Sequence, residues 1–259
     1  MTAKQRFFIE LAYDGTNYHG WQIQQNAVSI QQVLNDKLSV ILREPIETTG
    51  CGRTDTGVHA REFFAHFDVE GKSIDHGPWT MVENENMLRS INAILPDDIA
   101  IKKISPVAAD AHARFDATLR SYEYHIHFNK DPFKKGYSWE LRDHPDIDLM
   151  NKAAKIIMEF TDFSCFSKSN TQVKTNICKI SKAEWVTTDD GIVFHISADR
   201  FLRNMVRAIV GTLLMVSKKE IEPEAVRRII ESKNRSNAGM SVPACGLYLT
   251  EVKFSPLTP

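Results

Sequence analysis

Hydrophobic positions in the first part of the chain alternate between the spacing of strands and the spacing of helices. Residues 7–13 are typical of a strand, and residues 62–69 and 99–104 are typical of two more. Two helical stripes separate them, and the first consists of Ile30, Val33, Leu34, Leu38, Ile41 and Leu42. Ser29 and Gln32 form a capping-box pattern at the start of that helix. The predicted order is therefore β-α-β-α-β.

The second part of the chain has a similar layout. Residues 120–128 alternate as in a half-buried strand, residues 149–157 have helical spacing, and residues 180–186 and 192–198 form a hairpin pattern. A long apolar helix is indicated by Phe201, Met205, Ile209, Leu213 and Val216. A short basic helix and a strand over residues 247–254 complete the pattern.

These two series predict an α+β protein with two similar halves. We expect RRM- or ferredoxin-like halves whose antiparallel or mixed sheets meet at a central active-site cleft. The N-terminal domain is expected to span residues 1–110 and the C-terminal domain residues 111–259. With 259 residues, of which 42% are hydrophobic and 25% charged, the composition is that of an ordinary globular protein.

The net charge of −1 conceals an uneven distribution of charged residues. Residues 200–235 contain nine Lys or Arg against four Glu, whereas residues 68–99 contain two basic against seven acidic residues. A basic segment of this kind attracts a polyanion such as RNA, although a solvated helix face would have the same composition. Charge alone leaves both interpretations open.

Cysteine spacing and hydropathy indicate a reduced protein of the cytoplasm. The four cysteines show no C-x-x-C spacing, so we expect buried thiols and neither a zinc ribbon nor a redox pair. The longest apolar run, residues 208–216, is half as long as a membrane span. No membrane partner is expected.

The segment Arg53-Thr54-Asp55-Thr56-Gly57 contains the strongest candidate for chemistry. Asp55 lies between strand-like segments and close to Gly57, which permits an unusual backbone angle, so its carboxylate is a candidate reacting group. The alternative is an Asx-type turn in which Asp55 only satisfies loop amides. Asp-Thr-Gly also occurs in aspartic proteases, but those need two such carboxylates, and the helical patterns here disfavour that fold.

Other motifs exclude two classes of site and suggest a third. Gly15-x-x-x-x-Gly20 has the spacing of a phosphate loop but lacks its Lys and Ser or Thr. His125 and His127 share a strand face without a third ligand of suitable spacing, so no metal site is predicted. At helical spacing, a positively charged edge is predicted for Arg200, Arg203 and Arg207.

With these residues in view, the chain resembles the TruA-type tRNA pseudouridine synthases over nearly its whole length. The resemblance rests on six blocks in the order of that family, namely residues 13–22, 52–60, 92–99, 113–124, 201–207 and 246–249. It implies a cofactor-free isomerisation in which a uridine is turned out of the RNA, its N1–C1′ bond is broken, the base rotates and a C5–C1′ bond forms. By the same resemblance, Asp55 is the essential carboxylate, which either attacks C1′ or removes a ribose proton to form a glycal.

The resemblance also assigns roles to residues around the base. Tyr122 matches an active-site tyrosine that stacks on the flipped uracil, although a core-facing strand aromatic is the alternative. Arg207 matches the arginine that pairs with the catalytic aspartate, and Arg53 matches one that enters the RNA stack. Leu247 matches an aliphatic residue near the base, and Arg203 is expected to bind the RNA substrate.

The family further implies a homodimer in which one tRNA spans both subunits, with uridines 38, 39 and 40 of the anticodon stem-loop as targets. The chain departs from its pattern in two places: Glu62 and Phe63 replace a Gly-Gln pair, and Asn204 replaces a common histidine. A non-catalytic RNA-binding module with two RRM-like halves is the rival hypothesis, and binding alone would not require Asp55.

Overall fold

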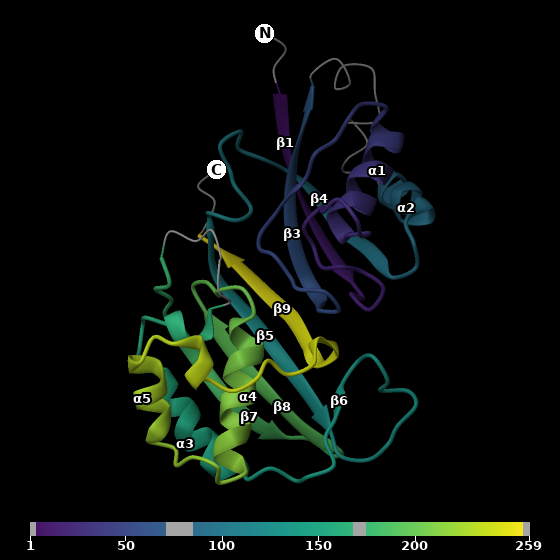
Figure 1. Ribbon diagram of the computed structural model, residues 1–259. Helices are drawn as coiled ribbons and strands as arrows, with labels where there is room; N and C mark the ends of the chain where they lie inside the picture. Colours follow the sequence, from purple (N-terminus) through teal and green to yellow (C-terminus); the bar gives the residue numbers. More distant parts are fainter. Residues whose placement is uncertain (1–3, 71–84, 168–174, 256–259) are drawn as a thin grey trace. The chain divides into compact units, whose positions relative to one another are not determined.

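The computed structural model describes residues 4–70, 85–167 and 175–255 and shows a mixed α+β protein (Figure 1). The chain divides into two compact units. The first unit comprises Met1–Thr118 and Glu251–Pro259, and the second comprises Leu119–Thr250. The last strand contributes residues to both units.

The first unit is built on an antiparallel sheet with β1 at its centre. Its elements are β1 (Lys4–Tyr13), α1 (Ile30–Leu42), β2 (Thr49–Gly50), β3 (His59–Glu70), α2 (Glu85–Ile94) and β4 (Ile99–Val107). β1 pairs with β3 on one side and β4 on the other, and β2 pairs with β3. α1 and α2 lie side by side in this unit (Figure 1). The predicted order is confirmed, with the short β2 added.

Local signals account for the start and the buried face of α1. Ser29 is its N-cap, because its hydroxyl accepts a hydrogen bond of 3.3 Å from the Gln32 amide. Leu34, Leu38 and Leu42 are buried at a spacing of four residues, as expected for a helix with one face on a sheet. The helix stops where Arg43 adopts a left-handed conformation with φ 55°.

The second unit has a mixed sheet, because β6 runs parallel to β5 while β8 is antiparallel to both β5 and β7. Its elements are β5 (Ala117–His127), β6 (Trp139–Glu140), α3 (Ile147–Ile157), a 3₁₀ turn (Ser164–Phe166), β7 (Ile180–Thr187), β8 (Gly191–Ala198), α4 (Met205–Ser217), α5 (Ala225–Glu231), two 3₁₀ turns (Arg235–Asn237 and Ala244–Gly246) and β9 (Leu247–Phe254). α3 packs against β7, α4 and α5 (Figure 1). The predicted final strand, residues 247–254, is confirmed with the same bounds.

The predicted charged edge of α4 is wrong. The helix begins at Met205, so Arg200 and Arg203 precede it and do not share a helical face with Arg207. Asn204 causes the break, because its left-handed backbone (φ 67°) cannot continue a right-handed helix from residue 203. Most residues of α4 are buried, as in a central helix that is apolar all round.

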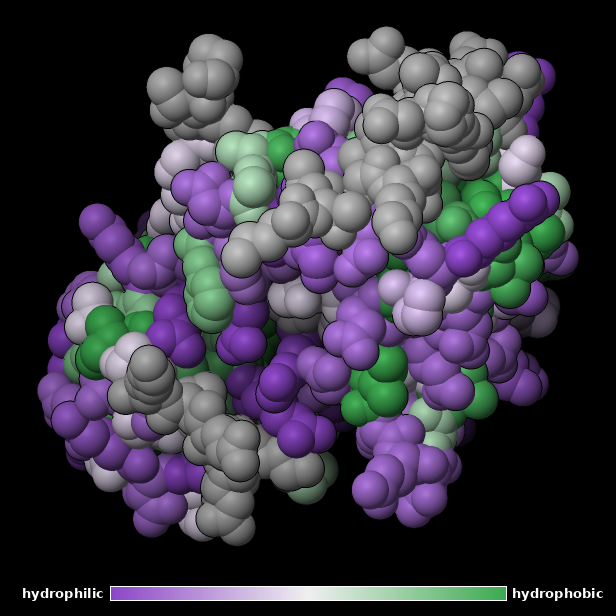
Figure 2. Space-filling model, turned by 90° about the horizontal axis from the view of Figure 1, so that it is seen from above, coloured by the Kyte–Doolittle hydropathy of each residue, from purple (hydrophilic) through white to green (hydrophobic). Residues whose placement is uncertain are grey.

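Burial and surface follow the expectations for a globular protein. Hydrophilic residues cover most of the face shown in Figure 2, with hydrophobic residues between them in small groups. Cys51, Cys165 and Cys178 are buried, and burial raises the pKa of the last two thiols to about 12. Within the described segments, every helix is too short or too polar to cross a lipid bilayer.

Candidate functional site

Asp55 lies in the loop between β2 and β3, and its side chain is half-buried. The residue before it is held by two contacts. The Thr54 hydroxyl lies 2.9 Å from the Tyr13 hydroxyl, and the Thr54 carbonyl accepts a hydrogen bond of 3.3 Å from the Trp21 amide. Thr54 is only 8% exposed. The residue that precedes Asp55 is therefore both buried and hydrogen-bonded, which fixes the backbone on that side of Asp55.

The residues after Asp55 form a tight turn. The Val58 amide donates to the Asp55 carbonyl over 3.1 Å, and the Gly57 amide donates to the Tyr18 carbonyl over 3.3 Å. Gly57 has φ 76°, a conformation that favours glycine. The hydroxyl of Tyr18 donates a 2.5 Å hydrogen bond to Asp98 Oδ1, and burial raises the pKa of Tyr18 further than this bond does. The turn is thus closed by the main-chain carbonyl of Asp55, through its hydrogen bond from Val58.

Two glycines allow residues 15–20 to lie directly against the Asp55 loop. A Cβ atom on Gly15 would stand 2.0 Å from the Val58 carbonyl oxygen, and one on Gly20 would stand 2.3 Å from the Thr54 carbonyl oxygen. Gly20 also has φ 83°. The two glycines, whose spacing resembles that of a phosphate loop, therefore allow two main-chain segments to pack closely. The sequence did not predict this role.

His59 connects the same two segments. Its side chain is 2% exposed, and its Nδ1 lies 3.0 Å from Asp14 Oδ1 and 3.2 Å from the Gly15 amide nitrogen. If Nδ1 carries a proton it donates to the Asp14 carboxylate, and if it does not it accepts from the Gly15 amide. It can therefore bond only one of these two groups at a time. The Asp14 carboxylate also accepts hydrogen bonds of 2.9 and 2.6 Å from the amide and hydroxyl of Thr16.

The departure from the family pattern at residues 62 and 63 has a structural explanation. The ring of Phe63 stacks on Trp21 at 4.2 Å and lies 5.5 Å from the ring of Tyr13. The Glu62 carboxylate accepts a 2.7 Å hydrogen bond from the Val252 amide. Both side chains therefore support the sheet of the first unit next to the loop, a role that needs neither glycine nor glutamine.

Arg53 lies in the same loop with its side chain exposed to solvent. Space around the loop is open on this side, because a Cβ atom on Gly52 would meet no heavy atom within 4 Å. An exposed guanidinium on a loop held at its other residues is available to a polyanion.

In the second unit, Tyr122 lies on β5 and is half-buried. The Phe201 ring meets the Tyr122 ring edge-on, at 5.1 Å and 87°. Tyr124, two residues along the strand, is fully buried, and its hydroxyl donates 2.8 Å to the Pro243 carbonyl. Burial raises the pKa of Tyr124. Of these two tyrosines, Tyr122 is the one with solvent access.

Arg207 lies in the first turn of α4, half-buried. Its Nε donates 2.7 Å to the Val242 carbonyl, and its own carbonyl accepts 3.3 Å from the Val242 amide. Burial raises the pKa of Cys245, and the positive charge of Arg207 opposes that shift. The structure thus places Arg207 against the segment that leads into β9.

That segment also contacts β5 and ends at Leu247. A Cβ atom on Gly246 would stand 2.6 Å from the His125 carbonyl oxygen, so glycine lets the chain pass close to β5. Leu247 follows as the first residue of β9 and is 5% exposed. Because residues 242–247 contact Arg207 through Val242 and β5 through Pro243 and Gly246, they bring these elements together within the second unit.

Arg203 is exposed in the turn that precedes α4. Next to it, Asn204, the second departure from the family pattern, donates through Nδ2 to the Ser241 hydroxyl, which also accepts 3.0 Å from Arg235. Asn204 therefore helps to hold the loop that contains Val242.

Part of the positive charge in residues 200–235 has acidic partners. Arg227 pairs with Glu159 at 2.6 Å, and Lys233 pairs with Asp162 at 2.8 Å. The hydrogen bond from Lys233 lowers the pKa of Asp162. These two cations thus contribute less to an RNA-binding surface than their number in the sequence suggests.

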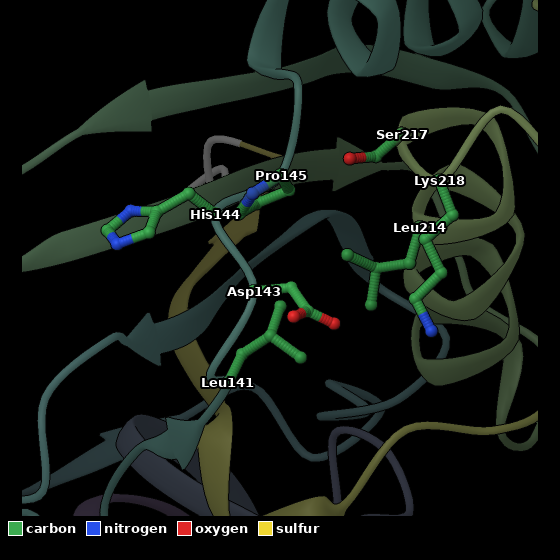
Figure 3. A pocket seen from close by; sticks show the side chains of 7 residues that line it. All are labelled: Leu141, Asp143, His144, Pro145, Leu214, Ser217 and Lys218. Atoms are coloured by element: carbon green, nitrogen blue, oxygen red, sulfur yellow. The ribbon is translucent and has the colours of Figure 1, made fainter.

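Two other features do not contribute residues to the predicted site. In the described part of the chain, no His, Cys, Asp or Glu cluster has a geometry that could hold a metal ion, and His125 Nε2 lies 3.0 Å from Glu123 Oε2. A pocket of about 220 Å³ lies between residues 141–145 and α4 (Figure 3). Leu141, Asp143 and Leu214 point into it, and His144 points away.

The predicted residues form two sets, each within one unit. Arg53 and Asp55 belong to the first unit, and the second unit contains Tyr122, Arg203, Arg207 and Leu247. Arg207 and Leu247 are joined through residues 242–247, and Tyr122 lies on the adjoining strand β5.

Comparison with known proteins gives a consistent result. A family model described as tRNA pseudouridine synthase matches residues 11–116 and 160–255, which include all the predicted site residues except Tyr122. The chain is 49% identical over 251 residues to a Bacteroides fragilis protein named tRNA pseudouridine synthase A, covering 96% of each chain. Proteins of the same name from Parabacteroides distasonis (46%; 96% of each chain) and Clostridium acetobutylicum (38%; 95% of this chain and 98% of the relative) are similar over nearly their whole lengths.

Proposed function

This chain belongs to the tRNA pseudouridine synthase family, a family of isomerases, and we propose that it converts uridine to pseudouridine in tRNA. The observation that carries the proposal is the end-to-end similarity to proteins of that name, which covers 96% of both chains in the first comparison. The rival hypothesis, a non-catalytic RNA-binding module, has no comparable support.

In the proposed reaction, Asp55 acts at C1′ of a uridine that has been turned out of the RNA. Its carboxylate either attacks C1′ and displaces uracil or removes a ribose proton so that a glycal forms. The freed base rotates and its C5 bonds to C1′, which releases the Asp55 carboxylate in the first route and is accompanied by return of the ribose proton in the second. C5 then loses its proton while N1 takes up a proton, so the net change is an isomerisation. Glycosidases need a second carboxylate to activate water, whereas here the departing base is itself recaptured.

The environment of Asp55 supports this role. A reacting group has to be held within a fraction of an ångström, and the loop around Asp55 is fixed by hydrogen bonds on both sides and by close packing against Gly15 and Gly20. The carboxylate remains half-buried, so a nucleoside has access to it.

The remaining site residues are proposed to act on the same nucleoside. Tyr122 stacks on the uracil and assists loss of the C5 proton, and Leu247 packs near the base. Arg207 pairs with the catalytic carboxylate. Arg53 fills the place that the uridine leaves, and Arg203 binds the RNA backbone.

The finer substrate assignment is also a proposal. We infer uridines 38, 39 and 40 of the anticodon stem-loop as targets, and a homodimer as the active form. This inference rests on the family resemblance of the sequence blocks.

The test is the product of the purified protein on unmodified tRNA. We expect pseudouridine at positions 38–40, detected by carbodiimide labelling and mass spectrometry. Asp55→Asn should lower product formation by at least about 10³-fold while tRNA affinity stays within about threefold, because the substitution removes the charge and keeps the shape. Asp97→Asn, at an exposed aspartate of the same unit, is the matched control and should retain activity. Full product formation by Asp55→Asn would refute the catalytic role, and tRNA binding without product by the wild type would favour the binding module.

A further inference from the structure

The loop between β5 and β6, residues 128–138, has no assigned role in the proposed reaction. It extends beyond the strands of the second-unit sheet (Figure 1). The sequence of this β5–β6 loop contains three lysines and three aromatic residues, a combination that occurs in elements that bind single-stranded nucleic acid.

Phe133 is the middle residue of this loop in the sequence and is 90% exposed, the highest value among the large hydrophobic residues that the structure describes. Burial of a phenyl ring is favourable, and a ring exposed to water does not gain this free energy. An exposed Phe on an ordered loop is therefore a candidate contact for a partner that covers the ring when it binds. Tyr137, in the same loop, is 48% exposed.

The loop holds Phe133 in a defined position. The Phe133 amide donates 2.9 Å to Asp131 Oδ1, and the Lys134 amide donates 3.2 Å to the Asp131 carbonyl. The Tyr137 carbonyl accepts a 2.6 Å hydrogen bond from the Tyr248 hydroxyl, which joins the loop to β9. Contacts before and after Phe133 in the sequence reduce the ordering entropy that binding would otherwise cost.

Charge around Phe133 suits an anionic partner. Lys130 and Lys135 are exposed on either side of the ring in the sequence. Lys134 forms an ion pair with Asp190, so it offsets one acidic side chain of the β7–β8 turn. An exposed ring with an exposed lysine on either side in the sequence suits a base with a phosphate on either side.

We propose that the β5–β6 loop is an RNA contact in which Phe133 stacks on an unpaired base of the bound tRNA while Lys130 and Lys135 contact neighbouring phosphates. The proposal rests on the proposed function, because it takes tRNA as the ligand. Stacking on an aromatic ring requires an unpaired base, so the contact falls in a loop or at the end of the tRNA and not within a stem.

The test measures tRNA affinity in the Asp55→Asn background, in which binding is observed without turnover. Phe133→Ala should weaken binding about 5- to 150-fold, which is the range for loss of one stacked base. Phe133→Tyr should bind as the parent does, because it keeps the aromatic face, and Phe133→Leu should bind as weakly as Phe133→Ala. Lys130→Ala and Lys135→Ala should each reduce the slope of log K against log salt by about 0.7 to 0.9.

Matched controls are Val40→Ala, at a 67% exposed residue of α1, and Lys155→Ala, at an exposed lysine of α3. Neither should change affinity or the salt slope. Parental affinity in Phe133→Ala would overturn the proposal, and so would full affinity in Phe133→Leu, which would indicate an apolar protein contact. A loss of affinity that follows dissociation of a dimer in sedimentation would assign the loop to a second copy of the chain. Wild-type protein that neither binds tRNA nor forms pseudouridine would instead refute the proposed function itself.

Discussion

Gly15→Ala tests whether close packing beneath the Asp55 loop is needed for catalysis. The added Cβ would stand 2.0 Å from the Val58 carbonyl oxygen, whereas Cβ atoms essentially never come closer than 3.0 Å to such an atom. The difference requires the two segments to separate by at least about 1 Å, since hard-sphere overlap cannot be absorbed otherwise. The φ of Gly15 lies outside the left-handed region, so the substitution tests this contact and not backbone strain.

The displacement should reach the carboxylate, because Val58 donates the hydrogen bond that closes the turn onto the Asp55 carbonyl. A misplacement of about 1 Å at a reacting group costs about 10²-fold in rate, and overpacking costs about 1 to 3 kcal/mol of stability. We therefore expect single-turnover pseudouridine formation to fall about 10²-fold at saturating enzyme. Affinity for tRNA should change by less than about threefold, because the exposed Arg53 side of the loop remains accessible.

Gly52→Ala is the matched control, because its Cβ would meet no heavy atom within 4 Å. It adds the same methyl group to the same loop without a clash, so its turnover should stay within about twofold of wild type. Urea unfolding of both variants checks that the protein remains folded during the assay. Wild-type turnover in a folded Gly15→Ala protein would show that the contact with Val58 does not position Asp55.

Two further predictions concern stability. His66 is 7% exposed, and burial is the main cause that lowers its pKa to about 4. Between pH 6.5 and 4 the unfolded chain therefore binds a proton that the folded chain does not, so stability falls as pH decreases through this window, by about 2 kcal/mol from pH 7 to pH 5. His66→Asn can keep the hydrogen bond that His66 Nδ1 accepts from the Ala113 amide at 3.1 Å, but it removes the titrating group. Urea unfolding at pH 7 and pH 5 should then show a smaller loss of stability at the lower pH. If the loss of stability is the same as in the wild type, other groups cause it. Asn92 both accepts from and donates to the backbone of Ile101 at 2.8 Å, so Asn92→Ala should lower the unfolding free energy by about 1 to 3 kcal/mol; a change below about 0.5 kcal/mol would contradict this account.

The elements that sequence predicts best are those whose signals are local. The start of α1 is set by Ser29 and its buried face by leucines four residues apart, and both are visible in a single window of sequence. β9 has the predicted bounds for a similar reason, since a turn precedes it and apolar residues define it. In such segments, spacing and structure have the same cause.

The start of α4 shows where spacing fails. Arg203 and Arg207 are four residues apart, which is the spacing of one helical face, yet Asn204 takes a left-handed conformation between them. Asparagine adopts this conformation more readily than most residues, and here its side chain also donates a hydrogen bond to Ser241, 37 residues later in the chain. Periodicity contains no information about a partner so distant.

The glycines of residues 15–20 show the same limit at the site itself. Their spacing is close to that of a phosphate loop, and only their contacts with the carbonyls of Thr54 and Val58 reveal a different role. Those contacts join segments about forty residues apart in the sequence. They involve main-chain atoms, which every residue has, so the residue types do not reveal them. Asp55 could therefore be selected as a candidate from its own segment, but the residues that hold it could not.

Main-chain packing at Asp55 has a consequence for how the site tolerates substitution. Where a loop is held by side chains, a conservative replacement can keep the contact, whereas a carbonyl oxygen against a Cα leaves no room for any side chain. At Gly15 the constraint is therefore on size alone, whereas at Gly20 a positive φ adds a second constraint. Tyr13→Phe would remove the hydrogen bond to Thr54, at a cost of about 1 kcal/mol, and would add no atom that could push the loop away. The geometry of the carboxylate should thus be more sensitive to one added methyl group at position 15 than to the loss of the buried hydroxyl at position 13.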